Sequence, residues 1–96
     1  GRTLRLTMEI IRKAWAGTGE SSDAYVLVSP ANTLEIEISS VVYNQYAKAI
    51  DKAVRETLAD LGVEKGTITI NDKGALDCVI QARVETAIKR ASEAGV

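Results

Sequence analysis

The sequence predicts an α+β fold, a two-layer sandwich in which a small mixed sheet carries both of its helices on one face. Residues 34–40 alternate strictly between aliphatic and polar side chains, which is typical of a strand with one buried face. Residues 42–61 and 76–91 instead repeat their apolar side chains every three or four positions, as amphipathic helices do. Packing both helices against one side of a sheet would bury all of these apolar surfaces. The expected order is β-β-α-β-α after an uncertain N-terminal arm.

Three strands are expected, at residues 24–29, 34–40 and 67–70. The first is apolar almost without interruption, which favours a central position in the sheet, antiparallel to both other strands. Pro30 ends this strand, because proline donates no hydrogen bond to a ladder, and residues 30–33 are expected to form a hairpin loop. A right-handed crossover through the first helix is expected to join the second strand to the third.

The two expected helices have recognisable ends. One of the serines at 39–40 is expected to cap the first helix, and Gly62 to end it, with Val63 packing back onto the last turn. Either residue of the Asn-Asp pair at 71–72 is expected to cap the second helix. The first apolar stripe is Val42, Tyr46, Ala49, Ile50, Ala53, Val54, Leu58 and Leu61, and the second is Leu76, Val79, Ile80, Val84, Ala87, Ile88 and Ala91.

The N-terminal arm has two possible structures. Residues 4–10 alternate as a strand would, whereas Ile10, Ile11 and Ala14 fit one turn of a helix. Trp15, the single tryptophan, is interpreted as a packing anchor that ties the arm to the body of the protein. Contact with a partner protein is the alternative, because tryptophan is enriched at interfaces.

Composition excludes several classes of function. A chain of 96 residues predicts one domain, and a net charge of -1 with 4% aromatic residues argues against a nucleic-acid partner. No apolar run approaches the roughly 20 residues that span a bilayer, and nothing before Met8 resembles a secretory signal, so no membrane partner is expected. The single cysteine, Cys78, favours a reducing, cytoplasmic setting, and its thiol is expected to be buried and inert.

Histidine is absent from the sequence. A Ser-His or Cys-His nucleophile is therefore impossible within this chain, and so is a metal site with histidine ligands, so no metal is expected. Glu35 and Glu37 lie at alternate positions of one strand, which is typical of a solvated sheet face and not of a catalytic carboxylate pair. If a serine of this protein reacts, a group outside the chain must activate it.

A small polar segment, residues 16–23, precedes the first predicted strand and reads Ala-Gly-Thr-Gly-Glu-Ser-Ser-Asp. Gly17 and Gly19 indicate a turn or loop, because glycine accepts backbone conformations that other residues avoid. It lacks the Gly-Lys-Ser/Thr ending of a phosphate-binding loop and precedes a strand where that motif opens a helix. Composition alone leaves two interpretations: an ordinary surface connection, or a functional loop in which the hydroxyls of Ser21 and Ser22 stand clear of the fold.

Two motifs resemble a known family. Residues 71–83 read Asn-Asp-Lys-Gly-Ala-Leu-Asp-Cys-Val-Ile-Gln-Ala-Arg, and residues 16–23 fit the pattern Ala-Gly-Thr-x-Glu-Ser-x-Asp. Both are similar to the citrate lyase acyl carrier protein, the gamma chain of that enzyme. The resemblance spans roughly residues 8–92, so residues 8–96 are expected to form a single acyl carrier domain. Residues 1–7 are then an extension or residues added by cloning. The one departure is Gly19, where a larger aliphatic residue such as leucine is expected.

The resemblance implies that Ser21 carries a phosphoribosyl-dephospho-coenzyme A arm through a phosphodiester, with acetyl and then citryl groups held as thioesters on its thiol. The chain itself would catalyse nothing. Its partners would be the citrate lyase alpha subunit (acyl transferase), the beta subunit (citryl lyase) and a prosthetic-group transferase. Gly17 and Gly19 would let the arm move, and Glu20 and Asp23 would suit recognition by a cationic surface. Two alternatives remain: the carrier subunit of a malonate-decarboxylase-like complex, or a small interaction module without a covalent group.

Overall fold

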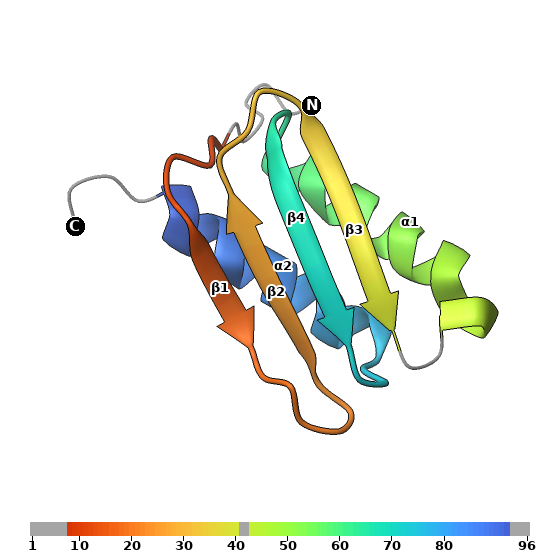
Figure 1. Ribbon diagram of the computed structural model, residues 1–96. Coiled ribbons are helices and arrows are strands. Elements are labelled where there is room, and N and C mark those ends of the chain that lie inside the picture. Colours follow the sequence, from red (N-terminus) through yellow and green to blue (C-terminus); the bar gives the residue numbers. More distant parts are fainter. Residues whose placement is uncertain (1–7, 41–42, 93–96) are drawn as a thin grey trace.

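The computed structural model of this chain describes residues 8–40 and 43–92. Within them it has four strands and two helices, and both helices lie on the same face of the sheet (Figure 1). The elements are β1 (Ala14–Gly17), β2 (Ala24–Ser29), β3 (Leu34–Ser40), α1 (Tyr43–Leu61), β4 (Gly66–Asp72) and α2 (Asp77–Ser92). The prediction of a two-layer α+β fold is confirmed.

The strands follow the order β1-β2-β4-β3. β2 is an interior strand, antiparallel to β1 and β4, whereas β3 pairs with β4 in parallel. The expectation that β2 also pairs with β3 was wrong, because β4 lies between them. Residues 30–33 therefore do not form a hairpin loop. They cross the N-terminal end of β4, where the Gly66 amide donates to the Thr33 carbonyl at 3.0 Å. The exposed Glu35 and Glu37 explain the outer place of β3, since charged side chains suit an edge strand.

The N-terminal arm contributes β1, a strand that the sequence pattern did not indicate. Ala14 and Ala16 pair with Val28 and Val26 of β2 and are only 7% and 2% exposed. Residues 8–13 form neither helix nor strand, and residues 1–7 lie outside the described part. Trp15 is 54% exposed, so its interpretation as a packing anchor was wrong.

The core lies between the helices and the sheet, and most of both predicted stripes is buried there. The fully buried side chains include Val26, Val28, Val54, Ile68, Ile70, Ile80, Val84 and Ile88. Two stripe residues were predicted wrongly, since Ala49 is exposed and Leu76 is 72% exposed. Leu76 precedes α2, and its carbonyl accepts the first helical amides, so its side chain lies off the buried face. Val42 and the side chain of Tyr46 lie outside what the structure describes.

The predicted end of α1 is confirmed. Gly62 has φ 73°, and the Val63 amide donates to the Leu58 carbonyl at 3.0 Å, as in a glycine C-cap. Ser39 and Ser40, proposed as caps of α1, are the last two residues of β3. The residues between them and α1 are outside the described part. None of the described helices is long and apolar enough to cross a membrane.

Neither Asn71 nor Asp72 caps α2 as expected, because both belong to β4. Asp72 is the last residue of that strand and is fully buried. Its carboxylate accepts a hydrogen bond from the Ser40 hydroxyl at 2.7 Å and another from the Ala75 amide at 2.8 Å. Asp72 therefore joins the end of β3 to the turn after β4, and α2 begins five residues later. This turn lies beside the loop between β1 and β2, which holds the serine motif (Figure 1).

Candidate functional site

Ser21 stands at the corner of a tight turn in the β1–β2 loop. The Asp23 amide donates to the Glu20 carbonyl at 3.1 Å, so Ser21 and Ser22 occupy the second and third positions of a β-turn. Ser22 has φ 66° and, among the described residues, is the one non-glycine residue with a positive φ. This backbone is that of a type II turn, which favours glycine at the third position. Both serines are exposed, and the Ser21 hydroxyl makes no hydrogen bond to any described residue.

The base of the turn is joined to the end of β4. The Ser22 amide donates to the Lys73 carbonyl at 2.8 Å, and the Lys73 amide donates to the Asp23 carbonyl at 2.9 Å. These two bonds continue the β2–β4 ladder, whose last pair is Ala24 with Asp72. The two motifs that carry the family resemblance, about fifty residues apart in sequence, therefore meet in space.

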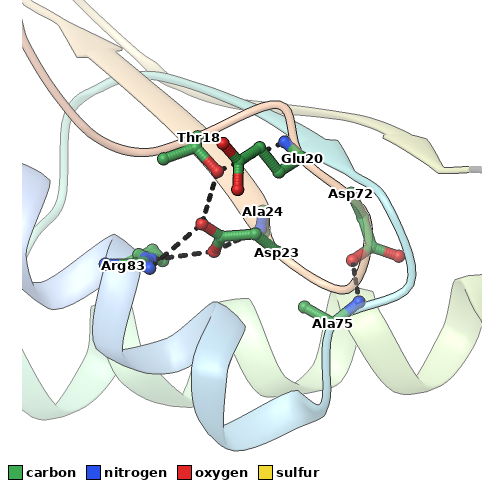
Figure 2. A network of polar contacts seen from close by, with 7 residues as sticks. All are labelled: Thr18, Glu20, Asp23, Ala24, Asp72, Ala75 and Arg83. Atoms are coloured by element: carbon green, nitrogen blue, oxygen red, sulfur yellow. Dashed lines mark hydrogen bonds and ion pairs between the residues drawn. The ribbon is translucent and has the colours of Figure 1, made fainter.

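The Asp23 carboxylate also ties the loop to α2 (Figure 2). Arg83 approaches this carboxylate with two nitrogens, Nε at 3.0 Å and Nη2 at 3.1 Å. The Thr18 hydroxyl donates to it at 2.6 Å and the Ala24 amide at 2.7 Å. We call Asp23, Arg83 and Thr18 the Asp23 clasp. These contacts lower the pKa of Asp23 from 3.8 to about 2. The hydrogen bond from Thr18 has the largest effect, followed by the one from the Ala24 amide and those from Arg83.

The two glycines of the loop differ in what they allow. Gly17 has φ 93°, and a Cβ built on it would collide with the carbonyl of Ala24 and crowd the Arg83 side chain. Glycine is therefore required there. Gly19 has no positive φ, and a Cβ at this position meets nothing within 4 Å. The one residue that departs from the family pattern thus lies where a larger side chain has room.

The acids of the motif also differ. The side chain of Glu20 is exposed, and only its backbone amide is bonded, to the Thr18 hydroxyl at 3.2 Å. The Asp23 side chain is 16% exposed, and both of its oxygens already accept hydrogen bonds. Of the two acids, Glu20 is therefore the one whose charge faces solvent.

Sequence patterns did not indicate two residues of the site, Thr18 and Arg83, and outside the site they misplaced Cys78. Thr18 and Arg83 were part of the quoted motifs, but no local pattern indicates that Arg83 pairs with an acid 60 positions earlier. Cys78, the second residue of α2, is exposed, so the prediction of a buried thiol was wrong. It lies one residue from the start of the helix, before the buried stripe begins at Ile80.

Comparison with known proteins identifies relatives over nearly the whole chain. A family model described as the malonate decarboxylase delta subunit matches residues 11–91. The citrate lyase acyl carrier protein of Escherichia fergusonii is 50% identical over 88 residues, which cover 90% of this chain and 91% of that protein. The citrate lyase acyl carrier protein of Clostridium perfringens is 53% identical over 88 residues, with 90% and 87% covered.

The fold has a counterpart among solved structures. A chain in the crystal structure of a Pseudomonas malonate decarboxylase hetero-tetramer in complex with malonate superposes with a TM-score of 0.77. The superposition covers 92% of both chains, at 22% sequence identity, so this likeness concerns the fold. Identity to the curated relatives is higher and covers nine tenths of the sequence. The chain therefore belongs to the family of citrate lyase acyl carrier proteins.

Proposed function

We propose that this chain is the acyl carrier subunit of a citrate lyase and that Ser21 is its attachment site. The group attached would be phosphoribosyl-dephospho-coenzyme A, joined to the Ser21 oxygen through a phosphodiester. Its thiol would hold acetyl and citryl groups while citrate is cleaved to acetate and oxaloacetate. The alpha and beta subunits would supply the acyl-transfer and lyase chemistry, and a separate transferase would load Ser21.

The observation that carries this proposal is the placement of the Ser21 side chain. It is exposed at a turn corner and has no hydrogen-bond partner among the described residues, while the turn beneath it is held from two sides. The chain has no histidine to remove the proton of a serine. Such a serine is a poor nucleophile by itself but is accessible to a transferase that brings its own base.

Ser21 is a better candidate than its neighbour Ser22. The backbone of Ser22 is fixed in the left-handed region, and its amide is bonded to Lys73. Glycine serves such a position at least as well as serine, so the turn does not need the Ser22 hydroxyl. Ser21 also follows Glu20 directly and precedes Asp23 by two residues, as the attachment serine of the family motif does.

Loading of the chain tests the proposal. The chain, Ser21→Ala and the matched control Ser22→Ala are each coexpressed with the citrate lyase modifying transferases, and their intact masses are measured. The unaltered chain and Ser22→Ala are expected to gain the mass of the arm, and Ser21→Ala to gain none. An unmodified parent chain would contradict the carrier function, and a loaded Ser21→Ala would contradict the assignment of the site.

We further propose that Glu20 contributes to recognition by a cationic transferase surface, whereas Asp23 acts by shaping the loop. Glu20→Lys is expected to slow loading without a change in melting temperature, because its side chain is exposed. Glu64→Lys reverses an exposed acid in the connection between α1 and β4 and is the control. Equal loading rates for the two variants would remove Glu20 from the recognition surface.

The description of the matching family model favours a second candidate, the carrier of a malonate-decarboxylase-like complex. Both candidates predict a loaded serine, so the mass measurement does not separate them. Assembly does: the loaded chain is mixed with the catalytic subunits of each enzyme, and citrate cleavage and malonate decarboxylation are assayed. Citrate cleavage alone is expected, since identity to citrate lyase carriers reaches 53%.

A further inference from the structure

One face of the sheet is covered by no helix of the described chain. Both helices pack against the opposite face, as Figure 1 shows. The strand register places four open-face side chains in one row across this surface: Trp15, Leu27, Thr69 and Glu37. With three inter-strand steps of about 4.8 Å, the row is roughly 14 Å long. We call this surface the open sheet face.

One end of the row is apolar. Trp15 is 54% exposed on the short edge strand β1, and its partner Leu27 on β2 is half-buried. Tyr25, two residues before Leu27, lies on the same face and is also half-buried. Tryptophan and tyrosine are enriched among the residues that anchor protein interfaces.

The other end of the row is acidic. Glu35 and Glu37 are exposed on β3, and neither has an ion-pair partner among the described residues. The four described strands contain no lysine or arginine at all. At the Trp15 end of the row, Arg90 of α2 donates to the Trp15 carbonyl at 2.9 Å. Two negative charges without an ion-pair partner among the described residues therefore stand at the β3 end, although the net charge of the whole chain is only -1.

We propose that the open sheet face docks on a protein surface with an apolar recess for Trp15 and with lysine or arginine side chains opposite Glu35 and Glu37. The separation of the two ends requires the basic groups to lie roughly 14 Å from the recess. Uncompensated acids repel the phosphates of nucleic acids and of anionic lipids, which makes a basic protein the fitting occupant. Given the proposed function, this partner is a catalytic subunit of citrate lyase.

The position of Ser21 is consistent with a partner bound to the open sheet face. The β1–β2 loop joins the two strands that carry Trp15 and Leu27. A partner on the open sheet face would therefore lie beside Ser21, the proposed attachment site of the prosthetic group. The helices occupy the opposite layer and would stay away from the interface.

Binding to the purified alpha and beta subunits tests the proposal, with the dissociation constant measured by calorimetry for the full chain and its variants. Trp15→Ala is expected to weaken binding about 30-fold, the loss typical of an interface anchor. Glu37→Lys is expected to slow association and to reduce its dependence on salt. The matched controls are Leu76→Ala, which removes an apolar side chain that is 72% exposed, and Glu56→Lys, which reverses an exposed acid on α1. Circular dichroism confirms that each variant is folded.

The outcomes separate this proposal from the proposed function. If the parent chain binds neither subunit, the carrier function fails and the docking surface fails with it. If the parent chain binds and Trp15→Ala binds equally well, the open sheet face is not the interface while the carrier function stands. If Leu76→Ala weakened binding to the subunits as much as Trp15→Ala does, the proposal would be overturned in the same way.

Discussion

At the scale of single residues, Asp23 connects the serine turn to the rest of the molecule. Its carboxylate receives two nitrogens of Arg83 from α2 and the hydroxyl of Thr18 from its own loop. A bidentate arginine fixes the orientation of a carboxylate as well as its position. The backbone of Asp23 is fixed as well, by its bonds to Lys73 and Glu20. The clasp therefore fixes the orientation in which the turn presents the Ser21 side chain to solvent.

Removing the arginine tests this role. Arg83→Ala is expected to slow loading of Ser21 by roughly ten- to a hundredfold, because a misplaced reacting group loses rate steeply. Arg55→Ala is the control, since Arg55 also pairs with an acid, Asp51 at 2.9 Å, but on the exposed surface of α1. Loading is followed by intact mass over time. Equal rates for both variants would show that the clasp does not position the serine.

The titration of Asp23 reports on the same contacts. Because the folded-state pKa of Asp23 lies below its ordinary value of 3.8, its hydrogen bonds stabilise the folded chain fully above pH 3.8. That contribution is lost as the pH falls through about 2. An NMR titration of the Asp23 carboxyl is expected to give a midpoint near 2 in the parent chain and one shifted toward 3.8 in Thr18→Ala. An unchanged midpoint in Thr18→Ala would exclude the threonine as the main cause.

At the scale of elements, the β1–β2 hairpin depends on one of its two glycines. Gly17→Ala is expected to destabilise the fold by about 1–3 kcal/mol, because φ 93° is strained for alanine and its Cβ meets the Ala24 carbonyl. Gly19→Ala is expected to be neutral or to stabilise by about 0.4–1 kcal/mol, since it restricts only the unfolded chain. Urea denaturation measures both differences. Similar destabilisation by both variants would contradict the assigned difference between the glycines.

The elements also show why sequence patterns predicted some of this fold and not the rest. β3 and most of the buried helix positions follow from periodicity, which each segment carries within itself. β1 reads Ala-Trp-Ala-Gly, a run too short and too weak in strand propensity to be recognised, and it is a strand because it pairs with β2. The place of β4 between β2 and β3 likewise depends on pairing and not on local pattern.

The candidate site likewise has a part that local sequence predicts and a part that depends on contacts between distant residues. The Ser21 loop was predicted from its own glycines and from the family motif. The pairing of Asp23 with Arg83 was not, because it joins residues 60 positions apart. Leu76 and Cys78 were misplaced because α2 starts at Asp77, five residues after Asp72, the later of the two expected caps. The Asp72 carboxylate instead accepts a hydrogen bond from the Ala75 amide, in the turn that precedes the helix.

At the scale of the whole molecule, the stability of the core and the order of the serine turn are separable. Val26, Ile68 and Ile70, on the interior strands β2 and β4, are fully buried, whereas the serine turn is exposed and held by two backbone bonds to Lys73 and by the Asp23 clasp. In native-state hydrogen exchange, the paired amides of β2 and β4 are therefore expected to open only with global unfolding. The Ser22 amide is expected to open locally, at lower free energy.

The Arg83→Ala variant makes this separation measurable. It is expected to speed exchange of the Ser22 and Lys73 amides, because the clasp beside them is lost, while protection of the paired amides of β2 and β4 stays close to that of the parent chain. Arg83 lies on the loop side of α2 with 39% of its side chain exposed, so its removal leaves the buried stripe intact. A uniform loss of protection through the sheet would mean that the clasp supports global stability. A carrier needs a rigid body and a well-placed turn, and the expected pattern assigns these two tasks to different sets of contacts.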